Sequence, residues 1–326
     1  MSKHKSTEFS LSTIKQISTV LVKITLVCAA LLFIYRKLTQ NGVQDIENLY
    51  HHITKHRIIT VKNIVLLLCF SGLNWFLESL KWQYLTTQIT RISLLEATEQ
   101  SLGALTASII TPNRIGEYGA KAIYYKKSLR KKIVGLNFIG NLSQLICTLL
   151  FGCIGLTYVI YAYKLPVSYI NLLSVVSVLL VCVIFYTQYL SKTDFSIKGY
   201  SFKKLNQFVT SLKFKTLVVS FTLSLLRYLC FSNQFYILIW LLGVEIDYID
   251  AMAFISSMYI LASIIPTVFI FDVAIKSSIA VWLFSFSNAN ELTIIACTTL
   301  MWILNFALPA LLGSYSVLNF KFPEEE

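Results

Sequence analysis

The sequence contains few of the residues that soluble domains need. Charged residues make up 13% of its 326 residues, and it has only 5 prolines and 12 glycines. Five windows contain no charged residue at all: 133–163, 165–191, 228–244, 251–271 and 292–320. No polar stretch or Gly/Ser/Pro-rich linker is long enough to separate a soluble domain, so we expect residues 1–326 to form one domain.

These windows predict an integral membrane protein of the all-α polytopic class. Hydrophobic residues make up 56% of the chain, and its mean hydropathy is +0.67. A spanning helix needs about 20 apolar residues to cross a hydrocarbon core of about 30 Å, which each longer window provides.

Acidic residues are also scarce, and the formal net charge is +12. The excess lies in loops, above all in 121–132, which has six Lys or Arg and no acid, and in 191–215, which has six Lys and one Asp. Such loops are typical of the cytoplasmic side of membrane proteins, so the charge does not indicate nucleic acid binding. A role of these lysines at lipid headgroups is the weaker alternative.

Motifs for metal, cofactor or catalysis are missing. The seven cysteines lie in apolar segments without CxxC spacing, which is typical of small core residues. His52 and His56 are one helical turn apart but have no third ligand nearby. The chain has no nucleophile elbow, P-loop or Gly-rich dinucleotide loop, so we expect no catalytic residue, metal or cofactor and favour a role other than an enzyme.

The apolar segments and the charge rule together predict the topology. Six helices are expected to span fully, at about 16–35, 61–80, 133–163, 167–190, 216–242 and 292–320. With both termini cytoplasmic, the segments 93–132 and 250–291 each start and end on the same face. We therefore expect two re-entrant helical hairpins, one from each face, in a bacterial inner membrane protein. A pair of short full spans in place of one hairpin remains open.

Proline and glycine interrupt both hairpins. Pro112 and Gly116 follow the apolar helix predicted over 93–110, and Pro266 ends the helix predicted over 251–265. Opposed broken helices that meet near the midplane are typical of transporters built from inverted repeats.

Each predicted hairpin tip carries an acid and a base four residues apart. Glu117 precedes Lys121 in the first, and Asp272 precedes Lys276 in the second. This order is stabilised by pairing and by the helix dipole. Charges at membrane depth are costly and usually functional, and a broken helix is tolerated only where it lines protein or a wet cavity.

Two arginines complete the candidate site. Arg114 lies at the first tip, and Arg227 lies about three turns into the helix predicted over 216–242. With Lys121 and Lys276 they give four cations against the carboxylates of Glu117 and Asp272, a net charge of +2 that suits a phosphate. Alternatively, Arg227 pairs with Asp272 or with carbonyls, and Glu117 and Lys121 only neutralise each other.

Polar side chains inside the spans have a simpler interpretation. Asn137, Asn141, Gln144 and Thr148 form a stripe at helical spacing, and Asn74 and Glu78 lie on the preceding span. Such residues more often join helices by hydrogen bonds than bind a ligand.

Three segments resemble the lysylphosphatidylglycerol synthase transmembrane region, also called the flippase-like domain family. They are 79-SLKWQYL-85, 111-TPNRIGEYGAKA-122 and 264-IIPTVFIFDVAIKSSIAVWLF-284. The second is similar to the family's Pro-x-Arg-x-Gly-Glu motif. The third departs from it, because no glycine lies between Gly243 and Gly313, and Asp272 stands where many members have Glu.

The resemblance implies an eight-segment fold with two re-entrant helices and a role in moving phospholipids between leaflets. Members that synthesise lysylphosphatidylglycerol carry a soluble aminoacyltransferase domain at the C-terminus. The present sequence ends at 323-PEEE-326 without one, so we do not expect it to make aminoacyl lipid by itself.

We therefore hypothesise a flippase or translocator for a phospholipid or a lipid-linked anionic substrate. Arg114 and Lys121 would bind phosphate from inside, and Lys276 and Arg227 from outside, with Glu117 and Asp272 orienting them. One alternative is a membrane glycosyltransferase with a lipid-phosphate donor, whose candidate bases are Asp45, Glu47, Glu245 and Asp247. Another is a small-solute secondary transporter. A homo-oligomer is left open.

Overall fold

The computed structural model describes residues 60–109, 111, 114–165, 196–197, 200–265, 269–287 and 289–322. Two predicted spans, 16–35 and 167–190, lie outside these residues, as do Pro112 and Pro266. The described chain is helical apart from one short antiparallel pairing of β1 (Ser196–Ile197) with β2 (Tyr200–Ser201). A short helix, α8 (Phe202–Ser211), follows this pairing.

Among the described residues, four helices are long and apolar enough to cross a membrane, which confirms the helical membrane class and matches four of the predicted spans. They are α3 (Val61–Thr86), α6 (Lys127–Ala162), α9 (Phe214–Leu241) and a final helix from Glu291 to Leu318. The final helix consists of α12 (Glu291–Trp302), a π-helical turn η3 (Ile303–Ala307) and α13 (Leu308–Leu318).

The helix α3 runs further than its sequence predicts. The prediction ended it at about Leu80, but the helix continues to Thr86. Lys81 is buried inside the protein and pairs with Glu78 one turn earlier, at 2.8 Å. Because this charge is neutralised within the helix, the helix does not have to end there.

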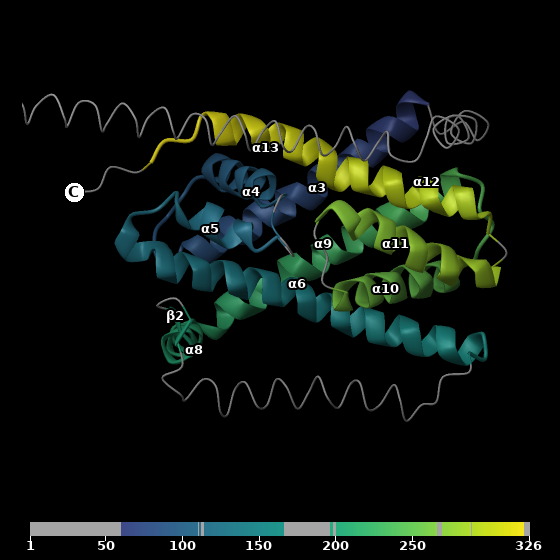
Figure 1. The fold of residues 1–326 in the computed structure, drawn as a ribbon, viewed down its shortest axis with the longest axis horizontal. Helices are drawn as coiled ribbons and strands as arrows, with labels where there is room; N and C mark the ends of the chain where they lie inside the picture. Colours follow the sequence, from purple (N-terminus) through teal and green to yellow (C-terminus); the bar gives the residue numbers. More distant parts are fainter. Residues whose placement is uncertain are drawn as a thin grey trace, which may run out of the picture.

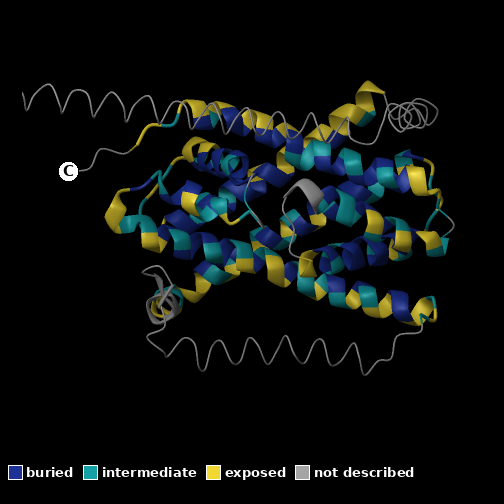
Figure 2. Ribbon diagram, in the orientation of Figure 1, coloured by how far each residue is buried: buried dark blue, intermediate teal, exposed yellow. Residues whose placement is uncertain are grey.

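Four shorter helices form two consecutive pairs. The first pair is α4 (Leu94–Ser108) and α5 (Gly116–Ala122), and the second is α10 (Tyr248–Ile264) and α11 (Phe269–Phe284), which a 3-10 turn, η2 (Ser285–Ser287), follows. In Figure 1, α4 and α5 occupy one half of the bundle, and α10 and α11 occupy the other. Much of α4 and α10 is buried among the long helices (Figure 2).

A capping box begins α4, at the start of the helix predicted over 93–110. The Ser93 hydroxyl accepts a hydrogen bond from the Glu96 backbone N–H at 3.2 Å, and the Glu96 carboxylate accepts one from the Ser93 N–H at 2.6 Å. These two bonds satisfy backbone donors that the first turn of the helix leaves open.

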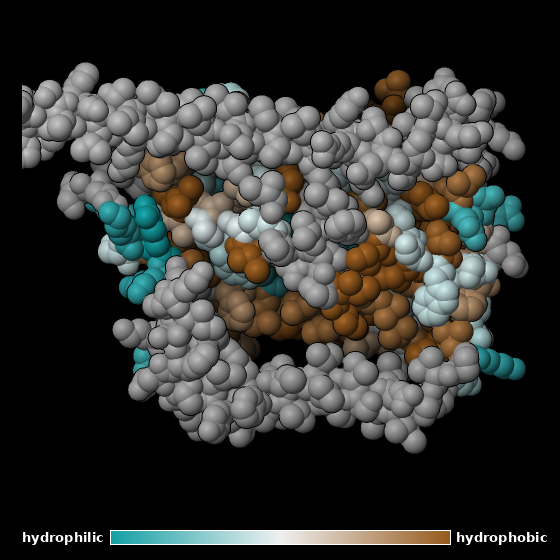
Figure 3. All heavy atoms as spheres, viewed as in Figure 1, coloured by the Kyte–Doolittle hydropathy of each residue, from teal (hydrophilic) through white to brown (hydrophobic). Residues whose placement is uncertain are grey.

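The two ends of the bundle differ in charge. One end, where α6 and α9 begin, carries the basic run 126–132 together with Lys213 and Lys215. The other end carries the acidic loop 244–250 and Glu291 at the start of α12. On the face drawn in Figure 3, hydrophilic residues lie at both ends and apolar residues between them.

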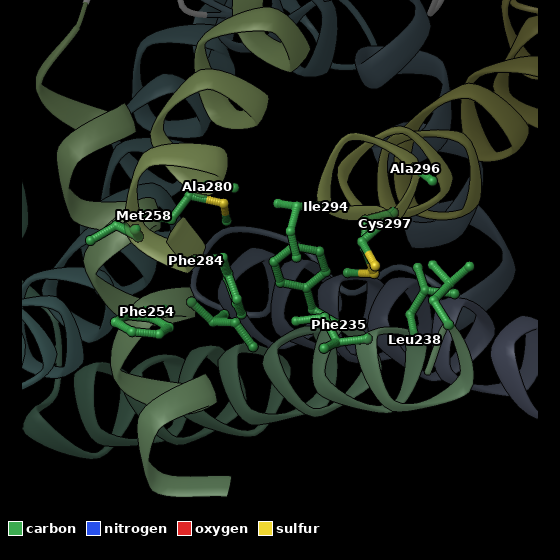
Figure 4. Packing of buried hydrophobic residues seen from close by; sticks show 14 of the residues in the cluster. Phe235, Leu238, Phe254, Met258, Ala280, Phe284, Ile294, Ala296 and Cys297 are labelled. Atoms are coloured by element: carbon green, nitrogen blue, oxygen red, sulfur yellow. The ribbon is translucent and has the colours of Figure 1, made fainter. Parts of the chain in front are cut away.

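The largest apolar core lies in the half that contains α10 and α11. Phe235 and Leu238 of α9, Phe254 and Met258 of α10, and Phe284 of α11 pack together there (Figure 4). This packing seats the second helix pair against the long helices.

A glycine allows α4 and α13 to approach each other closely. A Cβ atom at Gly313 would overlap the carbonyl oxygen of Leu102 and would lie 2.5 Å from the Thr106 hydroxyl. That hydroxyl donates a hydrogen bond to the Ala310 carbonyl at 2.8 Å, which joins the same two helices. In contrast, a Cβ at Gly72 of α3 would meet no atom within 4 Å.

We expect Gly313→Ala to lower the free energy of unfolding by about 1–3 kcal/mol, because α13 must move away from α4. Gly72→Ala should leave it unchanged or raise it by up to about 1 kcal/mol, since alanine favours helix. Melting temperatures in detergent compare the two variants. Equal melting temperatures would show that α4 and α13 are not packed as described.

Candidate functional site

Three polar side chains lie on one face of α3, a largely apolar helix. Asn74, Glu78 and Lys81 follow one another at spacings of four and three residues, which places them on the same side. All three are buried, and the side chains of Glu78 and Lys81 are only 7% and 2% exposed. Two opposite charges buried one turn apart must be paired, because an isolated buried charge is very costly.

Glu78 is the anion at the centre of the site. Its Oε2 atom lies 2.8 Å from the Lys81 Nζ and 2.7 Å from an Arg227 terminal nitrogen, and its Oε1 lies 3.7 Å from the Lys121 Nζ. The three cations come from α3, α9 and α5. One carboxylate therefore holds three helices together.

A second carboxylate, Glu117 of α5, adds two further contacts. It pairs with Lys121 at 2.9 Å and with Arg114 at 3.1 Å. The Lys121 ammonium also donates a hydrogen bond to Asn137 of α6 at 2.9 Å and lies 4.4 Å from the centre of the Trp82 ring. With 1% exposure and these partners, Lys121 is enclosed by the protein.

The end of α5 is anchored separately. Tyr125, just after α5, donates a hydrogen bond from its hydroxyl to Gln100 of α4 at 2.8 Å, and Trp82 of α3 donates to the same oxygen at 2.8 Å. Both hydrogen bonds end on Gln100, so α3 and the end of α5 are joined to α4.

Arg114 lies in the turn that precedes α5. Its φ is 57°, in the left-handed region that residues other than glycine seldom adopt, and such strain gathers at functional sites. Gly116 lies beside it in a tight turn, where its N–H donates to the Thr111 hydroxyl at 2.9 Å and a Cβ atom would lie 2.8 Å from the Thr111 methyl carbon. The Arg114 guanidinium is 35% exposed and lies 5.5 Å from the centre of the Phe306 ring.

Arg227 is held on two sides. In addition to its contact with Glu78, its Nε donates a hydrogen bond to Asn74 at 2.9 Å. Asn74 donates in turn to Asn305 at 2.9 Å, and Asn305 donates to Gln234 at 2.8 Å. Asn305 lies in the π-helical turn η3, and π-helical turns are frequent at functional sites.

Arg114, Arg227, Asn74 and Asn305 border a cavity of about 300 Å³. Among the residues that the structure describes, four charged ones line it: Arg114, Arg227, Asp272 and Lys276. Asp272 and Lys276 of α11 form an ion pair at 2.7 Å and are 23% and 34% exposed. The remaining wall is aromatic and amide-bearing, with Trp75, Phe231, Tyr259, Phe306, Asn74, Gln144 and Asn305 among its residues. A concave site with an apolar wall and a few convergent polar groups is typical of ligand sites.

The structure brings together four of the six predicted binding residues at this cavity. Glu117 and Lys121 instead lie behind it, in contact with Arg114 and Glu78. The predicted alternative of an Arg227–Asp272 pair is replaced by the Arg227–Glu78 pair. Of the polar stripe on α6, Asn137 binds Lys121, and Gln144 lines the cavity with neither of its amide atoms hydrogen-bonded among the described residues.

Sequence reasoning missed the role of Glu78 and Lys81. It assigned Glu78 to helix packing and considered Lys81 only as part of the segment 79-SLKWQYL-85. The signal was present, because an acid and a base three residues apart inside an apolar segment favour a buried ion pair. The described residues contain no group of three His, Cys, Asp or Glu that could hold a metal ion.

The long apolar helices and the cavity between them define a helical membrane protein with charged and polar side chains around an internal cavity. A model of one family, the lysylphosphatidylglycerol synthase transmembrane region, matches residues 20–313. The chain belongs to this family, which confirms the resemblance noted in its motifs and indicates a membrane function related to lipids. Comparison with curated proteins finds no match.

We expect Glu78→Gln to lower the free energy of unfolding by about 3–5 kcal/mol, because three cations lose their shared carboxylate in a buried setting. The matched control is Glu99→Gln on α4, where Glu99 is exposed. Adding Lys81→Gln to Glu78→Gln should restore part of the loss. Thermal melting in detergent checks this, and a Glu78→Gln variant as stable as the Glu99→Gln control would contradict the central role of Glu78.

Proposed function

We propose that this protein moves a phospholipid or a lipid-linked anionic substrate between the two leaflets of a membrane. The substrate headgroup enters the cavity and its phosphate binds to Arg114 and Arg227, while the acyl chains stay in the bilayer. The observation that carries the proposal is a cavity lined by three cations and one carboxylate inside a bundle of apolar helices. Ionisable residues at such depth mark substrate pathways.

We further propose that the two pairs of short helices are re-entrant hairpins that meet at this cavity. At 1.5 Å per residue, the 15 residues of α4 and the 16 of α11 span about 22–24 Å, less than a hydrocarbon core of about 30 Å. The pairs lie in opposite halves of the bundle (Figure 1). Arg114 follows α4, and Asp272 lies in the first turn of α11, so residues at both turns reach the same cavity.

The lipid translocator fits the cavity better than the two alternatives do. Of the acids that a glycosyltransferase could use as a base, Glu245 and Asp247 lie in the loop before α10 and do not line the cavity. Asp45 and Glu47 lie outside the described residues. A carrier of small solutes shares the cavity geometry, but the family indicates a lipid.

The bundle is oriented, in this proposal, with its basic end and both termini in the cytoplasm of a bacterial cell and its acidic end outside. Lys213 and Glu245 are exposed residues at opposite ends of α9, which makes them a matched pair of probes.

In a background without native cysteine, Glu245→Cys should react with a membrane-impermeant thiol reagent in intact cells. Lys213→Cys should react only after the membrane is opened, because basic loops stay in the cytoplasm. Mass-tag labelling on gels reads both out. Reaction of Lys213→Cys in intact cells would show that the bundle has the opposite orientation to the one proposed.

Proteoliposomes that contain only this protein test the function through transport of a leaflet-resolved fluorescent or spin-labelled phospholipid. We expect Arg114→Gly to reduce transport roughly 10- to 100-fold, because one charge-assisted contact contributes about 1.5–3 kcal/mol. The same change relieves the left-handed φ at this position, and Glu117 keeps Lys121 as partner, so the melting temperature should stay equal or rise.

The control is Arg91→Ala, which removes an exposed arginine outside the cavity and should leave transport unchanged. Arg114→Lys should keep part of the activity, since it retains the charge but not the bidentate geometry. Normal transport by Arg114→Gly would show that this residue only forms a turn.

A further inference from the structure

The cavity has more positive charge than its own carboxylates neutralise. Arg114, Arg227 and Lys276 line it together with a single carboxylate, Asp272, among the described residues. The cluster behind it adds Lys81 and Lys121 against Glu78 and Glu117, which cancel. Whether the cavity alone or the whole cluster is counted, a formal charge of +2 remains.

No carboxylate of this cluster is free to remove that excess. Glu78 is shared by three cations, Glu117 by two, and Asp272 already binds Lys276 at 2.7 Å. The Nε atom of Arg114 is buried and has no hydrogen-bond partner among the described residues. An excess of positive charge that converges on one cavity is unfavourable unless water or an anionic ligand compensates it.

We propose that the site selects a headgroup with two negative charges on phosphate, such as a terminal phosphomonoester. This inference rests on the proposed function and specifies its substrate class. A dianion neutralises the cavity, whereas a phosphodiester leaves one positive charge uncompensated. A headgroup that also carries an ammonium group adds repulsion, because the only carboxylate lining the described cavity is already paired with Lys276.

The size and wall of the cavity agree with a compact headgroup. Its volume of about 300 Å³ lies at the lower end of the range for small-molecule sites. Trp75 and Phe306, which line it, lie beside Arg227 and Arg114, at 5.7 Å and 5.5 Å from ring centre to guanidinium carbon. The rings pack beside the guanidinium groups, and a phosphate would bind the guanidinium nitrogens that Asn74, Glu78 and Glu117 do not already bind.

The first experiment measures binding to the purified protein in an uncharged detergent. Short-chain phosphatidic acid, phosphatidylglycerol and phosphatidylcholine with the same acyl chains are compared at pH 7.5. We expect phosphatidic acid to bind about tenfold more tightly than phosphatidylglycerol, with phosphatidylcholine weakest. Because the second ionisation of a phosphomonoester has a pKa of about 6, this preference should shrink at pH 5. Binding of phosphatidylglycerol, measured at each pH, serves as the control for any change in the protein's own charge.

Glycerol 3-phosphate is the soluble competitor in the same assay. It carries the same phosphomonoester without acyl chains, so it should displace phosphatidic acid only at a far higher concentration. Displacement at a comparable concentration would overturn the lipid part of the inference and identify a soluble phosphomonoester as the ligand.

A charge series at the second helix pair gives the sharpest test. Lys276→Gln lowers the cavity charge to +1, Asp272→Asn raises it to +3, and the double variant keeps it at +2. We expect the preference for phosphatidic acid over phosphatidylglycerol to fall about tenfold in the first, to rise in the second and to return in the third. A purely structural ion pair would instead make both single variants lose binding in the same direction.

The outcomes separate this inference from the proposed function. Equal binding of phosphatidic acid and phosphatidylglycerol would overturn the inference that the site selects a dianionic headgroup. The same holds if both single variants change the preference in the same direction. Selective binding of phosphatidic acid without transport in proteoliposomes would support the selection of a dianionic headgroup and refute the proposed transport function. Melting temperatures of the three variants, measured without lipid, confirm that each is folded.

Discussion

The structure depends on one buried carboxylate that three cations share. Glu78 contacts Lys81, Lys121 and Arg227, and these contacts connect α3 to α5 and α9. The connection continues on both sides, from Lys121 to Asn137 of α6 and from Arg227 through Asn74 to Asn305 of the last helix. In a membrane, where apolar contacts between helices gain little over contacts with lipid, such polar links decide which helices stay together.

The three cations at the cavity differ in how firmly they are fixed. Arg227 is 16% exposed and is held by both Glu78 and Asn74. Arg114 and Lys276 are about twice as exposed, and each contacts a single carboxylate. Arg227 is therefore the most firmly held of the three, whereas Arg114 and Lys276 have fewer polar partners among the described residues.

The sequence predicted the four spans that the structure describes and part of the cavity lining. Charge-free windows locate spans directly, and ionisable residues inside or beside them are conspicuous, so Arg114, Arg227, Asp272 and Lys276 could be named without a structure. The residues with which they pair could not be predicted in this way. Glu78 and Arg227 lie 149 residues apart, and no local spacing relates them. The spacing of Glu117 and Lys121 predicted their pairing, but it did not show that Trp82 and Asn137 enclose the lysine. The π-helical turn at Asn305 has no sequence signal of this kind either.

The two helix pairs carry the same acid–base spacing but use it differently. Glu117 and Lys121 are 7% and 1% exposed and have further partners in Glu78, Arg114 and Asn137, so they belong to the scaffold. Asp272 and Lys276 are 23% and 34% exposed and face the cavity as a single pair. Breaking the first pair leaves several buried charges without a partner, which destabilises the fold. Breaking the second costs little stability, because water already reaches it. The same spacing therefore occurs in two settings: α5 contributes a buried pair that holds helices together, and α11 contributes a more exposed pair at the cavity.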